Sequence, residues 1–164
     1  RKVRYIKRLM NDKSLKIIKS KDFKTFYKIL KQSKKKYNAL PTHSLKELIK
    51  LQNLFPENIQ LFVSIKKNII IGGTLLFYPN IRTCLVFYNV VDKLYANNQL
   101  ASFQLYNAMF CAKKNNCNVI DFGVSHLPET SFPLSPKFSL IQFKEQFGAK
   151  GCLRTVYRKD LSFE

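Results

Sequence analysis

The first third of the chain alternates apolar and basic positions with the period of a helix. One face carries large apolar side chains, while lysines occupy much of the remaining surface. The apolar positions are Phe23, Phe26, Tyr27 and Leu30. This pattern predicts an amphipathic helix, preceded by a short basic helix or lead-in over residues 1–10 and a brief strand over residues 15–18.

A second helix is predicted after Pro41. Ser44 and Glu47 have the S-x-x-E spacing of a capping box, in which each side chain pairs with a backbone N–H of the first turn. The helix is expected to end near Leu54, before Pro56.

Three segments rich in β-branched and aromatic residues follow, at residues 60–66, 69–78 and 82–91. Only two to three residues separate them, which predicts an antiparallel meander. The pair Gly72-Gly73 lies inside an apolar strand. It indicates a bulge or a close approach of another backbone, and no helix follows it as a phosphate loop would require.

The last part of the chain predicts a long helix that Asn97 or Asn98 caps and that continues to about Lys114. A short strand over residues 119–122 is expected to lie parallel to the third meander strand, followed by an irregular loop, a helix over residues 137–147 and a strand over 152–158. The order β-α-α-β-β-β-α-β-α-β predicts a mixed α/β (α+β) fold. Residues 1–14 are interpreted as a basic lead-in or linker, and residues 15–164 as a single domain.

The net charge of +19 is concentrated near the start of the chain. Residues 1–36 carry fifteen basic and two acidic side chains. The excess indicates either a polyanionic partner, such as tRNA or another RNA, or a solvated lysine face. No apolar run is long enough to span a membrane and no signal peptide is evident, so a cytoplasmic protein is expected. Because the sequence begins with Arg1 rather than Met, it is also consistent with a domain cut from a longer protein.

The cysteines show no paired spacing typical of a metal site. Cys84, Cys111, Cys117 and Cys152 form no C-x-x-C motif, and no histidine is close enough in sequence to complete one. We therefore expect no metal and reduced, partly buried thiols, a description that Cys111 fits best because it lies within an apolar helix pattern.

Three segments of the last third resemble signatures of an acyltransferase group. They are the helix containing residues 106–108, the sequence I-D-F-G at 120–123, and F-K-E-Q-F-G at 143–148. Together with the element order, they resemble GNAT-fold N-acyltransferases, in particular the C-terminal GNAT-like domain of the Fem-type (FemAB-like) group. The resemblance implies transfer of an acyl or aminoacyl group to an amine, from an acyl-CoA thioester or an aminoacyl-tRNA.

The donor is left open because the chain departs from the family pattern. Residues 94–101 stand where enzymes that use acetyl-CoA have a glycine-rich pyrophosphate loop, and they contain no glycine. The N-terminus of the following helix is still able to bind phosphate through its N–H groups and dipole. A single domain slightly favours acyl-CoA, whereas the basic residues 1–36 favour tRNA. The resemblance also implies an N-terminal GNAT-like half, a homodimer or a domain that acts alone.

The candidate catalytic residues are Lys144, Asp121 and His126. Lys144 interrupts the apolar arc of its predicted helix, where it either snorkels or holds a donor phosphate or developing oxyanion. Asp121 ends a strand and either orients or deprotonates an amine, or caps the next turn. His126, one of two histidines, is a residue type suited to proton transfer near neutral pH, but a lone loop histidine also fits a merely exposed position. His43 is assigned no role.

The remaining site predictions concern contacts to the donor or acceptor, and several rest on the resemblance. Tyr88 and Asn89 lie on the strand that borders the transfer cleft in GNAT-like folds. The full set of predicted contact residues is Tyr88, Asn89, Asn97, Asn98, Gly123, Ser125 and Phe147. No nucleophile signature is present, so direct attack of the amine is expected. The alternative function is a non-catalytic module that binds RNA or another polyanion through its lysine-rich first third.

Overall fold

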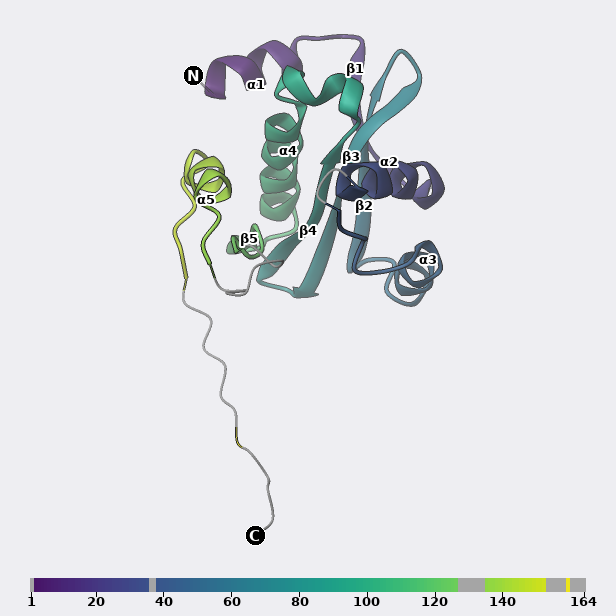
Figure 1. Cartoon of the computed structure of the whole chain (residues 1–164), viewed down its shortest axis with the longest axis vertical. Helices are drawn as coiled ribbons and strands as arrows, with labels where there is room; N and C mark the ends of the chain where they lie inside the picture. Colours follow the sequence, from purple (N-terminus) through teal and green to yellow (C-terminus); the bar gives the residue numbers. More distant parts are fainter. Residues whose placement is uncertain (1, 36–37, 127–134, 153–158, 160–164) are drawn as a thin grey trace. The chain divides into compact units, whose positions relative to one another are not determined.

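The computed structural model describes residues 2–35, 38–126, 135–152 and 159 (Figure 1). The chain forms two compact units, Arg1–Gly123 and Val124–Glu164. The predicted lead-in belongs to the first unit as helix α1 (Lys2–Met10). The predicted strand at 152–158 lies almost entirely outside the described residues. The described part of the chain contains no helix with the length and apolar character needed to cross a bilayer.

The first unit is built on a five-stranded mixed sheet in the order β1-β2-β3-β4-β5. The strands are β1 (Leu15–Ser20), β2 (Ile59–Lys66), β3 (Ile69–Asn80), β4 (Thr83–Val91) and β5 (Val119–Asp121). The first four pair antiparallel, and β5 pairs parallel with β4. This arrangement confirms the predicted meander and the predicted parallel strand, because a tight turn can join only antiparallel neighbours.

Helices cover both faces of this sheet (Figure 1). α2 (Phe23–Lys35) and α3 (Leu45–Leu54) lie on one face and α4 (Leu100–Lys114) on the other. Phe26, Leu30 and Leu48 are fully buried beneath α2 and α3, where they pack with apolar residues of β2–β4. α1 contributes Leu9 to a second cluster around Leu100 on the α4 side. The apolar face predicted for α2 is therefore the face that packs on the sheet.

The start of α3 confirms the predicted capping box. The Ser44 hydroxyl accepts a hydrogen bond from the Glu47 N–H at 3.3 Å, and the Glu47 carboxylate accepts one from the Ser44 N–H at 2.6 Å. The hydrogen bond from the Ser44 N–H, followed by the Ser44 side chain, holds the pKa of the Glu47 carboxyl below its usual value. Two backbone donors that the helix cannot satisfy are thereby paired.

The start of α4 differs from the prediction. A 3-10 helix, η1 (Lys93–Asn98), precedes α4. The N-cap of α4 is Gln99, which lies in the left-handed region with φ 57°. The Gln99 side chain makes no capping bond to the helix backbone. The asparagine caps were wrong because Asn97 and Asn98 are used in the 3-10 turns instead. The burial of α4 is also incomplete, since Tyr106 and Phe110 are exposed.

The cysteines described by the structure are all free, and Cys111 is partly buried as expected. Cys84 is fully buried on β4, whereas Cys111 is only half-buried. Burial raises the pKa of the Cys84 thiol to about 12 and also raises the pKa values of Cys111 and Cys117. These three thiols therefore stay protonated at neutral pH, which makes them poor nucleophiles and poor metal ligands.

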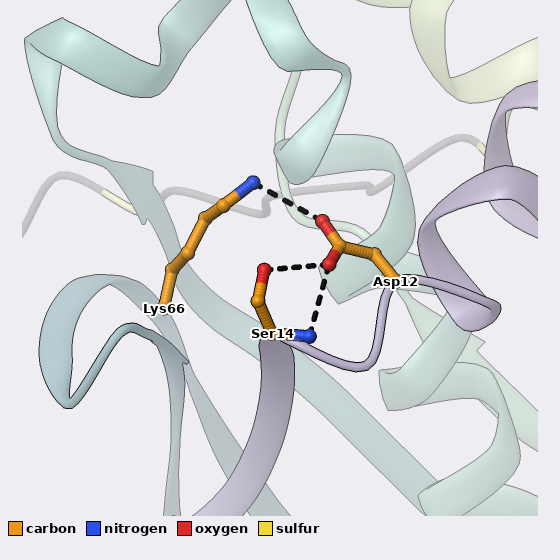
Figure 2. Close-up of polar contacts among 3 residues, drawn as sticks. All are labelled: Asp12, Ser14 and Lys66. Atoms are coloured by element: carbon orange, nitrogen blue, oxygen red, sulfur yellow. Dashed lines mark hydrogen bonds and ion pairs between the residues drawn. The ribbon is translucent and has the colours of Figure 1, made fainter.

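Asp12, between α1 and β1, accepts three hydrogen bonds (Figure 2). The donors are the Ser14 N–H at 3.0 Å, the Ser14 hydroxyl at 2.6 Å and the Lys66 ammonium at 3.1 Å. They lower the pKa of Asp12 to about 2, with the Ser14 hydroxyl the largest cause. The ion pair with Lys66 also links the end of α1 to β2.

We expect Asp12→Asn to reduce the melting temperature at neutral pH and to have progressively less effect in acid. Because the folded-state pKa is depressed, the stabilisation is fully present above the unfolded value of about 4 and is lost as pH falls toward 2. Melting curves of both proteins between pH 7 and pH 2 measure this convergence. A difference that stayed constant across this range would show that the carboxylate charge is not responsible.

Candidate functional site

The candidate site begins where β5 stops pairing with β4. The described residues of β5 pair with β4 over residues 83–85 only, although β4 continues to Val91. Residues 86–91 pair with β3 on their other side, and no described strand pairs with them on the β5 side. Among the described residues, β4 is therefore unpaired on this side beyond Leu85.

A bulge in β4 occurs at this point. Leu75 and Leu76 are consecutive on β3, but they pair with Tyr88 and Val86, so Phe87 is the extra residue. A bulge bends the strand that contains it and increases its twist. The bend at Phe87 lies two residues after Leu85, the last residue of β4 that pairs with β5. This position accounts for the divergence of the two strands.

Tyr88 and Asn89, predicted to contact substrate, point to opposite faces of the sheet. Tyr88 is buried in the α2–α3 core, and its hydroxyl accepts a hydrogen bond from the Thr42 N–H at 3.0 Å. Asn89 accepts from Thr74 at 3.2 Å and donates to the Ala101 carbonyl at 3.1 Å. Tyr88 thus holds the loop before α3, and Asn89 ties α4 to β3 and β4.

A cation lies at the N-terminus of α4. The Lys2 ammonium donates to Gln99 Oε1 at 2.7 Å and to Ser102 Oγ at 2.9 Å. Partial burial lowers the pKa of Lys2. Asn98, the last residue of η1, is exposed, and nothing is described of the Asn97 side chain. A lysine and a helix N-terminus together create a positive potential, which favours an anion.

Asp121 and Gly123 form a turn immediately after β5. The Asp121 carboxylate accepts a hydrogen bond from the Gly123 N–H at 2.6 Å, and Gly123 has the positive φ of 72° that glycine adopts most easily. This contact is the turn cap that the sequence analysis gave as one of two roles for Asp121. The bond uses one carboxylate oxygen, so the catalytic role of Asp121 stays a prediction.

The second unit holds the other predicted residues around α5 (Phe138–Glu145). The Lys144 ammonium donates to the Val124 carbonyl and to the Ser125 hydroxyl, each at 2.8 Å. Phe147, just after the helix, packs edge-on against Phe143 with ring centroids 5.4 Å apart. Lys144 thus connects α5 to the residues that follow Gly123.

The structure therefore brings the predicted residues into two groups. Tyr88, Asn89 and Asp121 lie near the diverging ends of β4 and β5, whereas Lys144 and Ser125 meet within the second unit. His126 is half-buried and forms an isolated antiparallel bridge with Pro136. The predicted approach of Lys144 to the strand ends stays a prediction.

Two residues beside the β4 edge were not singled out by the sequence. His43 packs against the ring of Phe87, and Lys2 contacts Gln99 and Ser102 about a hundred residues away in sequence. Neither belongs to a recognisable motif. The described residues contain no cluster of three or more histidine, cysteine or acidic side chains that would hold a metal ion.

The fold is similar to that of acetyltransferases of known structure. A possible acetyltransferase from Clostridium difficile 630 superposes with a TM-score of 0.67 at 15% identity, covering 92% of this chain and 100% of its own. An aminoglycoside acetyltransferase from an uncultured soil metagenomic sample, solved with sisomicin, has a TM-score of 0.63 at 14% identity, covering 90% and 97%. A GNAT family acetyltransferase from Elizabethkingia anophelis, solved with acetyl-CoA, has a TM-score of 0.55 at 13% identity, covering 83% and 76%.

No protein-family model matches the sequence, and no curated protein matches it. At these identities the likeness establishes the fold, which is the GNAT fold expected from the sequence. It does not extend to the Fem-type subgroup.

Proposed function

We propose that the protein is an N-acyltransferase that transfers an acyl group from an acyl-CoA thioester to a substrate amine. The observation that carries this proposal is the edge of β4 between residues 86 and 91, which diverges from β5 at the Phe87 bulge. Backbone N–H and C=O groups along such an edge are suited to an extended chain with amide groups, such as the pantetheine arm of CoA. The GNAT fold of the solved acetyltransferases supports the same assignment.

The phosphate groups of the donor would be held at the N-terminus of α4. The glycine-rich loop is missing, so the backbone of residues 93–98 is wound into η1 rather than into an open cradle. Lys2 compensates in part, because its ammonium adds a full charge beside the first turn of α4. The residues present therefore fit an anionic donor, with α1 supplying a charge that the loop lacks.

Direct attack of the amine on the thioester carbonyl is the mechanism that fits these residues. The buried Cys84 and the half-buried Cys111 and Cys117 are held in the thiol form, so they do not support a covalent acyl-enzyme intermediate. The contribution of the protein is then to position donor and acceptor and to stabilise the oxyanion that forms.

The lysine stripe on α2 gives a specific reason to keep a polyanion as the second candidate. Lys24, Lys28 and Lys31 are all exposed and lie on the solvent side of the helix. They could contact the tRNA part of an aminoacyl-tRNA donor, as in Fem-type enzymes, or RNA in a non-catalytic module. Because these side chains face solvent rather than the sheet, the two functions can be separated by mutation.

The test is binding of acetyl-CoA and of tRNA by the wild-type chain and by the triple variant Lys24→Gln, Lys28→Gln, Lys31→Gln. We expect acetyl-CoA to raise the melting temperature of both proteins equally, and acetyl transfer to an amine to be detected by release of free CoA. The triple variant should change the unfolding free energy by less than about 1 kcal/mol, because all three positions are exposed.

Lys2→Met serves as the positive control for the donor site, and we expect it to weaken acetyl-CoA binding. The opposite result favours the second candidate: tRNA binding that falls steeply with salt, is lost in the triple variant, and is accompanied by no acetyl-CoA binding. That outcome would contradict the acyl-CoA proposal.

A further inference from the structure

A histidine from the loop before α3 lies beside the bulge of β4. The His43 ring packs edge-on against Phe87, with ring centroids 5.3 Å apart and planes inclined by 62°. Phe87 in turn stacks on Phe77 at 4.3 Å. The hydrogen bond from the Thr42 N–H to the Tyr88 hydroxyl fixes the loop against the same strand. The imidazole is thus held at the residue where β4 leaves β5.

The two ring nitrogens of His43 have different surroundings. Nδ1 is buried and has no hydrogen-bond partner among the described residues. The ring as a whole is half-buried, so Nε2 is the nitrogen that an incoming molecule is able to reach. A buried polar atom without a partner costs stability, and such atoms are retained mostly where a site requires them.

Few charged groups face this ring. From α3, the Glu47 carboxylate interacts electrostatically with His43, but its hydrogen bonds go to Ser44. From α2, the Lys34 ammonium lies 6.0 Å from the centre of the Tyr88 ring, next to Phe87. Phe87 and Phe77 contribute apolar walls. The ring is thus held in place by Phe87 and by the loop that Thr42 anchors to Tyr88, and the hydrogen bonds given for the Glu47 carboxylate do not go to it.

We propose that His43 is the general base of the transfer and accepts a proton from the acceptor amine at Nε2. This inference rests on the proposed N-acyltransferase function and assigns the acceptor to the side of β4 that faces α2 and α3. At neutral pH the bound amine is an ammonium, which first loses one proton to Nε2; the neutral nitrogen then forms a bond to the thioester carbonyl carbon. The C–S bond breaks, the electron pair leaves with the CoA sulfur, and the thiolate takes up the second proton that the nitrogen releases. His43 returns its proton to solvent.

The competing explanation is that His43 only fills space at the edge of an aromatic cluster. Packing alone would place no demand on proton exchange, so the two roles predict different pH dependence. A general base matters most when the amine is protonated. It matters little at high pH, where the amine is already neutral.

The experiment compares pH–rate profiles of the wild type and His43→Gln, with acetyl-CoA as donor and a panel of primary amines comprising an aminoglycoside, spermidine and a lysine-containing peptide. We expect kcat at pH 7 to fall by about 10²-fold or more, with KM for acetyl-CoA nearly unchanged. The deficit should shrink steadily as pH rises toward the pKa of the amine. Lys46→Gln, an exposed change in the first turn of α3, is the matched control and should leave the profile unchanged.

Each other outcome overturns the assignment. Equal rates, or a deficit of constant size at every pH, would leave His43 with a packing role only. His43→Asn is measured in parallel, so that a folding defect in one variant does not decide the result. If the wild type transfers acetyl groups and His43→Gln transfers them equally well, the role of His43 is contradicted and the proposed function is not. A wild type that neither binds acetyl-CoA nor acylates any amine contradicts the proposed function, and the inference with it.

Discussion

Gly72→Ala is expected to destabilise the first unit by about 2–3 kcal/mol, the scale of overpacking in a well-packed core. A Cβ at Gly72 would lie 2.6 Å from Gln104 Nε2 and 2.6 Å from the Val90 carbonyl oxygen. The carbonyl belongs to β4 and cannot move without disturbing the β3–β4 pairing. The Gln104 amide is buried and bonded to Ser64 at 3.0 Å. Urea denaturation followed by circular dichroism measures the loss.

Gly151→Ala is the matched control, because a Cβ there would have no neighbour within 4 Å and the backbone does not have a positive φ. Its effect should lie within about 0.5 kcal/mol, as for most exposed positions. The close approach at Gly72 confirms what the Gly72-Gly73 pair indicated in the sequence, and the bulge at Ile71 adds the second feature that was foreseen. If the two alanine variants were equally stable, the packing of α4 against β3 described above would be wrong.

Lys144→Met is expected to reduce turnover by roughly 10²-fold while leaving the protein folded, the scale seen when one oxyanion donor is lost. We propose that the ammonium serves the transfer site directly, by holding a donor anion or the developing oxyanion. Its hydrogen bonds to the Val124 carbonyl and the Ser125 hydroxyl would then orient it. Lys144→Arg keeps the charge in a broader planar group, so partial recovery is expected. Steady-state release of CoA from acetyl-CoA measures the effect.

Ser125→Ala separates this role from a purely structural one. It removes the hydrogen bond from the ammonium to the Ser125 hydroxyl and keeps the lysine charge. If Lys144 acted only by holding the loop, Ser125→Ala would reproduce much of the loss. Lys150→Met, at an exposed position after α5, controls for the change in net charge. Unchanged transfer by Lys144→Met would support the snorkelling interpretation and remove Lys144 from the catalytic site.

The parts of the fold that were predicted correctly depend on neighbours in sequence. The turn at Lys67-Asn68 joins two strands directly, and both residues adopt the left-handed conformation of a tight hairpin. The capping box of α3 involves residues three apart. Interactions of this range are encoded in the local sequence, and they were sufficient to give the meander. The parallel position of β5 followed instead from the long helical crossover that precedes it.

The start of α4 was predicted wrongly because a distant residue determines its surroundings. Gln99 takes an unusual backbone conformation and accepts a hydrogen bond from Lys2, which reaches it from α1. An asparagine before an apolar helix is a good local cap, but local propensity is weaker than a packed tertiary arrangement.

The sequence by itself determined the order of the elements, the apolar face of α2, the antiparallel meander and the GNAT resemblance. Each of these depends on the spacing of residue types within a short stretch of the chain. Only the tertiary structure decided the shape of the candidate site. The bulge at Phe87 follows from a register between two strands, and no pattern within β4 alone reveals it. His43 gains importance only because its loop folds back onto that bulge. Chemistry of this kind depends on side chains that meet across tens of residues, and the sequence encodes their meeting only through the packing of the whole unit.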